Sequence, residues 1–340
     1  MNAELVSATH LVLFPGAPDA IGGVEAAGRE AWRGLVASRA PVHAVHHVAG
    51  ASRAGSVWRV LRHRGATHVL VWYMDLLRLV PCLRRDARIV LFLHGIEAWR
   101  QQDRLTSHLL GRVHLFLVNS RHTWRTFLHF QPHLADRRHA LVPLGLDNVA
   151  DQPAPPDEHA PAALMLSRLD RREDYKGHRQ LIRAWRGVRE QVPGAQLWIA
   201  GEGDLRPSLE RLVTDEDSEG TIRFLGRLTE QQKIDRLTAS RCLALPSQGE
   251  GFGLVYLEAM RLGRPCLVST RDAGREVVNP PEAGLAADPE DAEALAAAAA
   301  RLLSPGDEWQ RWSVQARARY GAQFTGARFQ QRLVEALATV

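Results

Sequence analysis

Two glutamates flank a glycine-rich turn in the second half of the chain. The turn follows the predicted strand 242–245. It places Glu250 before a predicted helix and Glu258 inside that helix, with seven residues between the two. At a helical rise of about 1.5 Å per residue, the two carboxylates lie on the order of 10 Å apart, comparable to the reach from the sugar to the ribose of a nucleotide sugar. Gly251 and Gly253 let the backbone approach a ligand, and the helix start offers amides to a phosphate. We therefore prefer a ligand site here over a solvated acid beside a helix-capping acid.

Two cations follow an earlier predicted strand. Arg168 comes directly after residues 163–166, and Lys176 precedes a predicted helix that starts near Gly177. Two converging cations stabilise the negative charge of a departing nucleoside diphosphate. Only two of the 43 basic residues are lysines, Lys176 and Lys233, so a lysine at this position stands against a strong arginine bias. An ammonium group and a planar guanidinium are not interchangeable, which favours a binding role over two surface cations in a charged loop.

The segment Glu250-Gly-Phe-Gly-Leu-Val-Tyr-Leu-Glu258-Ala-Met resembles the signature of retaining glycosyltransferases of family 4, the glycosyl transferases group 1. The resemblance covers nearly all of the second half and the first half more loosely. It implies that Glu250 contacts hydroxyls of the donor sugar, that Glu258 holds the ribose, and that Arg168 and Lys176 bind the diphosphate. It also implies donor contacts along the turn, at Gly251, Phe252, Gly253 and Leu254.

Weaker signals lie in two further loops of the second half. The loop 200–204 follows a predicted strand and contains Gly201, and Asp204 is predicted to cap the next helix. The family has a similar loop close to the nucleotide, although a plain structural turn explains the residues equally well. Arg227 and Leu228 occupy the place where the family's backbone borders the base.

In the first half, Gly22 and Gly23 follow the first predicted strand and open a helix. Such a loop can offer bare amides to an anion, and it resembles the family's Gly-Gly loop near the donor phosphate. His94 ends an apolar stretch and is followed by glycine, with Glu97 as a weaker candidate. The family resemblance implies that His94 approaches the donor sugar at the reacting end. The alternative for the Gly22-Gly23 loop is a plain tight turn, and the alternative for His94 is a histidine with a structural role only.

No metal or cofactor is expected. Asp215 and Asp217 have the spacing of a metal-binding motif, but no apolar strand precedes them, so we interpret them as a solvated acidic loop. The cations at 168 and 176 remove the need for a metal counter-charge. The three cysteines are too few and too scattered for a disulfide framework or a zinc site.

Short apolar segments alternate with helical periodicity along the whole chain, which predicts parallel sheets covered on both faces. We expect an α/β protein of the GT-B type, with two Rossmann-like, doubly wound domains facing a cleft. The predicted boundaries are an acceptor-binding domain at 1–147, a proline-rich linker at 148–161, a nucleotide-sugar-binding domain at 162–322 and a C-terminal helix within 323–340 that packs back on the first domain.

The net charge of +5 is uneven. Residues 1–150 hold 18 Arg and 10 acidic residues, a net charge of 18 − 10 = +8, which leaves 5 − 8 = −3 for the rest. Segments 58–64 and 76–85 mix apolar and basic residues, so they either rest on an anionic membrane and reach a lipid-linked acceptor or are solvated helices. No nucleic-acid partner is expected. The N-terminus does not look like a signal peptide and no apolar run spans a membrane, which predicts a cytoplasmic protein, with a peripheral position at the inner membrane face left open.

The sequence thus predicts a metal-independent, retaining hexosyltransferase. The donor is a UDP- or GDP-sugar and the acceptor is a sugar or lipid-linked hydroxyl in polysaccharide, lipopolysaccharide or glycolipid assembly. Two alternatives stay open: a nucleotide-sugar-binding protein without transferase activity, and a GT-B-type hydrolase or epimerase of the nucleotide sugar.

Overall fold

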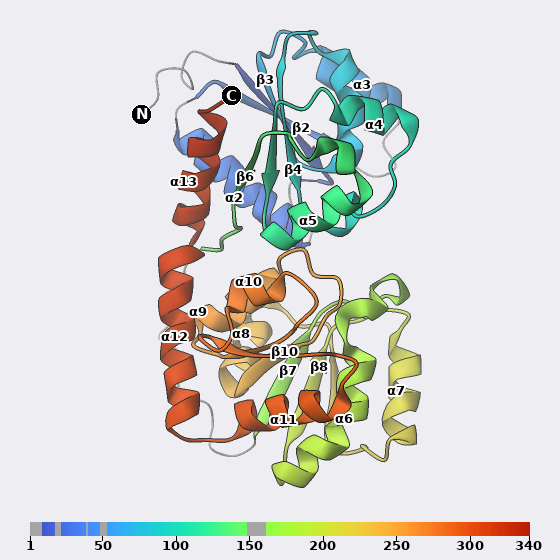
Figure 1. Cartoon of the computed structure of the whole chain (residues 1–340), viewed down its shortest axis with the longest axis vertical. Coiled ribbons are helices and arrows are strands. Elements are labelled where there is room, and N and C mark those ends of the chain that lie inside the picture. Colours follow the sequence, from blue (N-terminus) through green and yellow to red (C-terminus); the bar gives the residue numbers. More distant parts are fainter. Residues whose placement is uncertain (1–8, 18–21, 39, 48–52, 148–160) are drawn as a thin grey trace. The chain divides into compact units, whose positions relative to one another are not determined.

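The computed structural model describes residues 9–17, 22–38, 40–47, 53–147 and 161–340. The chain divides into two compact units, residues 1–147 with 324–340 and residues 148–323 (Figure 1). Most of the predicted linker, residues 148–160, lies outside the described residues. Each unit contains one six-stranded sheet in which all paired strands are parallel, which is the predicted α/β class.

The sheet of the first unit has the strand order β2-β1-β3-β4-β5-β6. Its strands are β1 (His10–Pro15), β2 (Val42–His47), β3 (His68–Val71), β4 (Arg88–Leu93), β5 (Leu115–Val118) and β6 (His139–Leu141). Its α-helices are α2 (Gly23–Ala37), α3 (Arg53–Leu61), α4 (Arg104–Leu110), α5 (Arg121–Phe130) and α13 (Gly326–Leu337). Among its described residues, this unit also has three short 3-10 helices: η1 (Met74–Cys82), η2 (Ile96–Ala98) and η3 (Pro132–Leu134).

Apolar side chains from one face of this sheet form a buried core cluster of the first unit. Leu11 and Leu13 of β1, Val69 of β3 and Leu91 of β4 are almost fully buried in one cluster. The C-terminal helix α13 packs against α2 in this unit. Its apolar stripe, which includes Phe329 and Leu333, is buried there.

The second unit has the strand order β12-β11-β10-β7-β8-β9. Its strands are β7 (Ala162–Leu166), β8 (Gln196–Ala200), β9 (Ile222–Gly226), β10 (Cys242–Leu245), β11 (Cys266–Ser269) and β12 (Gly284–Ala287). Its helices are η4 (Arg171–Lys176), α6 (His178–Gln191), α7 (Arg206–Asp215), α8 (Glu230–Ala239), α9 (Leu254–Arg261), α10 (Gly274–Val278), α11 (Ala292–Leu303) and α12 (Asp307–Gln323). Figure 1 shows α6, α7 and α11 on one face of the sheet and α8, α9 and α10 on the other.

The structure differs from the predicted elements at two places. The periodicity after β3 suggests an α-helix, but the chain forms the 3-10 helix η1, which contains Pro81 and so lacks one backbone donor. Strand β12 is not predicted, because its sequence Gly-Leu-Ala-Ala has few of the β-branched residues that are typical of strands.

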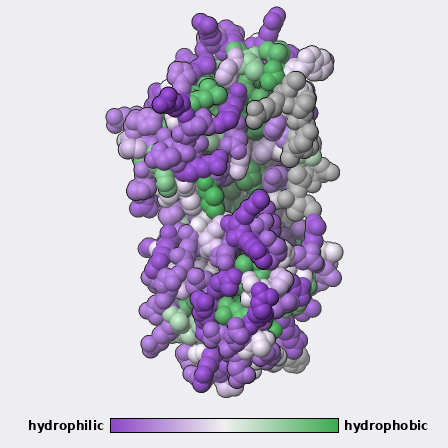
Figure 2. Space-filling model, turned by 90° about the vertical axis from the view of Figure 1, so that its right-hand side faces the viewer, coloured by the Kyte–Doolittle hydropathy of each residue, from purple (hydrophilic) through white to green (hydrophobic). Residues whose placement is uncertain are grey.

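Hydrophilic residues dominate the face shown in Figure 2, and hydrophobic residues reach it only in limited patches. Among the helices of the described residues, none combines the length and the apolar character that crossing a membrane requires.

Candidate functional site

The second sheet reverses its winding direction between β7 and β10. From β7 the chain continues to β8 and β9 on one side, and from β10 it continues to β11 and β12 on the other, while β7 and β10 pair directly. The crevice at the carboxyl ends of two such strands is where open α/β sheets bind ligands. The loop after β7 carries Arg168 and Lys176, and the loop after β10 carries Glu250. The topology thus brings the two predicted motifs to one edge.

Lys176 and Glu250 form a direct ion pair between these two loops. Both side chains are largely buried, with exposed fractions of 15% and 12%. Burial, the largest single influence, lowers the pKa of Lys176, but the charges of Glu250 and Tyr175 and the hydrogen bond to Glu250 together outweigh it, so the net shift is upward. The ammonium group also lies 5.2 Å from the centre of the Tyr175 ring. The lysine is therefore charged at neutral pH and held in place.

Close backbone contacts fix the two loops against each other. The amide of Gln248 donates to the carbonyl of Tyr175 at 2.8 Å. Gly177 has a φ of +85°, and a Cβ at this position would lie 2.4 Å from the carbonyl oxygen of Pro246. Only glycine tolerates both the left-handed backbone and this approach. The geometry of the ion pair therefore depends on Gly177.

Asp272, in the loop after β11, supports the backbone of Glu250. Its carboxylate accepts hydrogen bonds from the amide of Glu250 at 3.2 Å and from the amide of Gly274 at 2.9 Å. Burial raises the pKa of Asp272 to about 7, and the nearby charge of Glu250 adds to the effect. Two carboxyl groups therefore share this end of the sheet, and one of them is partly protonated at neutral pH.

The second glutamate of the motif has its own lysine. Glu258 lies in α9 and accepts a hydrogen bond from Lys233 of α8 at 2.7 Å. The side chains of Lys233 and Glu258 are 14% and 19% exposed. Burial, the largest single influence, lowers the pKa of Lys233, but the charge of Glu258 and the hydrogen bonds to Glu258 and Glu230 together outweigh it, so the net shift is upward. The only two lysines in the chain thus pair with the two glutamates of the predicted motif.

Arg168 is placed differently from Lys176. Its side chain is 76% exposed and pairs with Glu173 in η4. The two predicted cations therefore hold different carboxylates, and Arg168 has the freedom of a surface side chain.

Gly201 follows β8 with a φ of +141°, and a Cβ there would lie 1.8 Å from the carbonyl oxygen of Ser167. Packing against the loop that carries Arg168 is sufficient to explain this glycine. Asp204 is not the helix cap that the sequence predicts, because α7 begins at Arg206 after Leu205. Instead, Asp204 accepts a hydrogen bond from the amide of Arg171 at 2.9 Å, which ties this loop to η4.

The remaining predicted residues of the second unit border α8 and α9. Gly253, with a φ of +87°, immediately precedes α9, and Leu254 is its first residue. Phe252 is buried and Gly251 lies beside it. Arg227 is exposed and Leu228 half-buried in the turn between β9 and α8, whose capping box is formed by Thr229 and Gln232.

In the first unit, His94 follows β4 and is buried. Its Nε2 lies 2.8 Å from the carbonyl oxygen of Trp72, so this nitrogen carries the proton and donates. Burial lowers the pKa of His94 to about 4, and the hydrogen bond to Trp72 opposes this only in part. The imidazole is therefore neutral at pH 7. Its Nδ1 has no hydrogen-bond partner in the described part of the chain and remains an acceptor.

Trp72, directly after β3, connects His94 to the predicted glycine loop. Its side chain is fully buried and its Nε1 donates to the carbonyl of Val24, in the first turn of α2, at 3.0 Å. Gly22 is the residue before α2, and Gly23 is the first residue of this helix. Residues 18–21 of the same loop lie outside the described residues. One tryptophan thus sets the position of both first-unit elements that the sequence singles out.

The backbone of His94 is held from two sides. Its amide donates to the Glu97 carboxylate at 2.6 Å, and its carbonyl accepts from the Asn119 side chain at 2.7 Å. Glu97 is buried, and burial raises its pKa. The structure therefore gives Glu97 a role in positioning His94.

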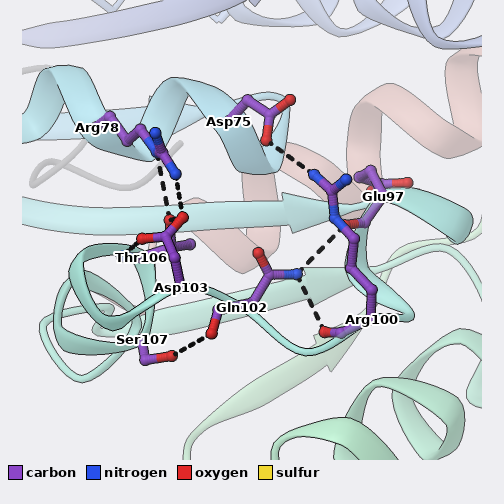
Figure 3. A network of polar contacts seen from close by, with 8 residues as sticks. All are labelled: Asp75, Arg78, Glu97, Arg100, Gln102, Asp103, Thr106 and Ser107. Carbon is purple, nitrogen blue, oxygen red and sulfur yellow. Dashed lines mark hydrogen bonds and ion pairs between the residues drawn. The ribbon is translucent and has the colours of Figure 1, made fainter.

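A polar network anchors the segment that follows His94 (Figure 3). Arg100 pairs with Asp75 of η1 at 3.3 Å, and Arg78 of η1 pairs with Asp103, the N-cap residue of α4. Gln102 donates to the carbonyls of Glu97 and Arg100 between these two ion pairs, as Figure 3 shows. The network ties the loop after β4 to the loop after β3, and so supports the contact between His94 and Trp72.

A cavity of about 430 Å³ lies beside these residues in the first unit. Aromatic side chains dominate its lining, and they come from β1, β2, α2 and the end of β3: Phe14, His46, Trp32 and Trp72. Glu25, Arg29 and Arg33 of α2 add charged groups to the lining. An apolar cavity with a few polar groups is the usual form of a small-molecule site.

Three residues with positioning roles are not among those predicted from the sequence. Lys233 has a sequence signal, the rarity of lysine in this chain, but no motif points to its partner. Trp72 lies within the predicted strand 68–73 and Asp272 lies in the loop after the predicted strand 265–269, yet only the fold shows which neighbouring residue each one supports.

Comparisons with known proteins agree with this architecture. The family model described as glycosyl transferases group 1 matches residues 150–319, half of the chain. A GDP-mannose-dependent monoacylated alpha-(1-6)-phosphatidylinositol monomannoside mannosyltransferase from Corynebacterium glutamicum is 33% identical over 178 residues, covering 48% of this chain and 46% of that protein. The chain therefore spans less than half the length of this relative.

Solved structures match over nearly the whole chain. An Anabaena protein, HepE, in complex with UDP and glucose has a TM-score of 0.76 at 18% identity, covering 98% of this chain and 100% of that one. A sucrose-phosphate synthase from Thermosynechococcus elongatus has a TM-score of 0.77 at 20% identity, covering 96% and 98%. At these identities the likeness is one of fold, and that fold is GT-B.

Proposed function

The chain belongs to the glycosyl transferases group 1 family, and from this premise we propose that it is a retaining, metal-independent hexosyltransferase. It moves a hexose from a UDP- or GDP-sugar to an acceptor hydroxyl in polysaccharide, lipopolysaccharide or glycolipid assembly. The observation that carries the proposal is the buried pair of Lys176 and Glu250 at the switch point of the second sheet.

Donor binding uses the charges at this edge of the sheet. Glu250 accepts hydrogen bonds from hydroxyls of the donor sugar, and Glu258, held by Lys233, accepts from the ribose. Lys176 and the exposed side chain of Arg168 bind the diphosphate. The free protein compensates each buried lysine with a glutamate, so the donor exchanges these protein contacts for its own diphosphate and hydroxyl groups.

The reaction proceeds on one face of the sugar. The bond from C1 to the diphosphate oxygen breaks, the bond from C1 to the acceptor oxygen forms on the same face, and the acceptor proton passes to the leaving phosphate. Lys176 and Arg168 stabilise the charge that develops on the diphosphate, which is why no metal is needed. His94, being neutral, accepts a hydrogen bond from a donor-sugar hydroxyl at Nδ1.

The first unit binds the acceptor. Its aromatic cavity takes an apolar part of the acceptor, such as the start of a lipid chain or the face of a sugar ring. Trp58 and Leu61 of α3 are 59% and 43% exposed, and Arg62 lies over the Trp58 ring at 4.9 Å. This surface suits the inner face of an anionic membrane, where a cytoplasmic enzyme meets a lipid-linked acceptor.

The proposal is tested by incubating the protein with UDP-glucose, GDP-mannose or ADP-glucose, with and without a bacterial lipid extract, and measuring transferred sugar and released nucleotide. We expect acceptor-dependent transfer from one donor that persists in EDTA. We also expect a loss of at least 100-fold in E250Q but not in E190Q, which removes an exposed, ion-paired glutamate. Nucleotide release without acceptor would identify a hydrolase, and binding without turnover a sugar-nucleotide-binding protein. Either result would overturn the proposal.

A further inference from the structure

A strongly basic cavity lies at the amino ends of strands of the first sheet, whereas His94 follows the carboxyl end of β4. It has a volume of about 560 Å³ and lies at the amino ends of β4, β5 and β6. Five arginines line it: Arg85, Arg88, Arg112, Arg137 and Arg138. Asp136 is the only acidic side chain in its lining, and His114 lies immediately before β5.

The charges of this cavity are not compensated by the protein. Within the described ranges, none of the five arginines forms an ion pair. Exposed arginines elsewhere do find carboxylates, as Arg84 does with Asp86 directly beside the cavity and Arg78 does with Asp103. The lining also includes Asp136 and the terminal carboxylate of Val340, so the five guanidinium groups outnumber the carboxylates and repel each other unless a further anion neutralises them.

Hydrogen bonds to backbone carbonyls hold three of these guanidinium groups in place. Arg112 donates to the carbonyl of Arg85 at 3.3 Å, Arg137 to that of Gly111, and Arg138 to that of Thr339 at 3.1 Å. Such contacts use part of each planar group and leave its remaining N–H donors for a ligand. The cavity is therefore organised before any ligand arrives.

His114 extends the set of donors. Its Nδ1 accepts from the amide of Ile89 at 3.0 Å, so the proton of the neutral ring is on Nε2. Burial lowers the pKa of His114, and the charges of Arg88, Arg137 and Arg112 lower it further. The positive potential of the cavity thus acts on a neighbouring titratable group.

We propose that this cavity is a second binding site, specific for a ligand that carries two or more phosphate groups. Its size falls in the range of small-molecule sites, and guanidinium groups match phosphate oxygens in charge and geometry. Arg88 and His94 lie at opposite ends of β4, roughly 20 Å apart at about 3.3 Å per residue, so within the first unit this cavity is separate from the surroundings of His94. The phosphates belong either to a free polyphosphorylated molecule or to lipid headgroups.

The test uses the full chain, with R85E/R88E as the variant. We choose these two arginines because their side chains make no hydrogen bond or ion pair in the described part of the structure, so replacing them removes no internal contact. The matched control is R223E/R311E, which changes the net charge equally at exposed positions of the second unit. Circular dichroism and thermal unfolding establish that all three proteins are folded. Tripolyphosphate binding is measured by isothermal titration, and vesicle binding is measured by flotation with phosphatidylglycerol or phosphatidylcholine.

We expect tripolyphosphate to bind the wild type, with affinity about 100-fold weaker in R85E/R88E and changed less than threefold in the control. Binding of the wild type to phosphatidylglycerol vesicles alone, lost in R85E/R88E, would support the site and identify lipid headgroups as the source of the phosphates. The proposal is overturned if neither probe binds at low salt, or if the variant and its control weaken equally. Basal hexosyl transfer is measured in parallel and is expected to be retained.

Discussion

The pairing of Lys176 with Glu250 makes a quantitative prediction about stability and turnover. Removing one partner leaves the other charged and largely buried, at 12–15% exposure. Breaking a fully buried pair costs about 3–5 kcal/mol, so we expect K176M and E250Q each to lower the free energy of unfolding by about 2–3 kcal/mol. The double variant leaves no unpaired charge and is expected to lose only about 2 kcal/mol in total. The coupling energy between the two residues is then about 3 kcal/mol.

Measuring turnover in the same variants distinguishes a loss of stability from a loss of catalysis. If the lysine binds the diphosphate and the glutamate binds the sugar, the double variant is no less stable than either single variant but stays at least 100-fold less active than the wild type. Unfolding is followed by urea titration with circular dichroism, and sugar transfer is followed by measuring the released nucleoside diphosphate. The exposed pair of Arg186 and Glu190 gives the control cycle, with a coupling energy below about 0.5 kcal/mol. Additive losses at positions 176 and 250, or activity regained in the double variant, would refute the reasoning.

Three further predictions concern single residues. G177A is expected to lower the free energy of unfolding, measured by urea titration, by about 2–4 kcal/mol more than G194A does. Both glycines have φ near +80°, but only at Gly177 would a Cβ meet a backbone carbonyl. Equal decreases in the two variants would contradict this. The folded-state pKa of His94 is lowered to about 4, so the folded state binds fewer protons than the unfolded state between pH 4 and 6.5, and stability falls as the pH falls. Between pH 7 and pH 5, the free energy of unfolding of the wild type should thus fall by about 2 kcal/mol more than that of H94Q. A difference between the two proteins that does not depend on pH would contradict a buried, neutral His94. R168A is expected to reduce turnover at least tenfold while lowering the free energy of unfolding by less than about 0.5 kcal/mol. R186A, which changes an equally exposed arginine, is expected to change neither quantity. Equal activities of the two variants would show that Arg168 is not part of the site.

Local patterns in the sequence predict most of this fold, because its strands are short, apolar and separated by helical periodicity. The alternation of β7, α6 and β8 is visible in the sequence, as is the motif around Glu250. Strand β12 is not visible, because its Gly-Leu-Ala-Ala sequence is stabilised by pairing with β11 and not by its own propensity. Residues with local signals are therefore predictable, and residues defined by non-local pairing are not.

The same distinction applies to the candidate site. Glu250 and Lys176 are separated by 74 positions in the chain, and their contact depends on the adjacency of β7 and β10. Lys233 is conspicuous by its rarity, but its contact with Glu258 requires α8 and α9 to lie together. No sequence signal distinguishes Trp72 from other core aromatic residues. Its role depends on two non-local hydrogen bonds, one from His94 to its backbone carbonyl and one from its indole N–H to the carbonyl of Val24.

The configuration of the transferred sugar decides whether the enzyme retains or inverts the anomeric centre of the donor. With the donor and acceptor found in the transfer assay, the product is purified and its anomeric configuration is assigned by proton and carbon NMR, with E250Q as the inactive control. We predict that an α-linked donor sugar gives an α-linked product, formed by the wild type only. A β-linked product would contradict retention, and free sugar as the only product would contradict transfer.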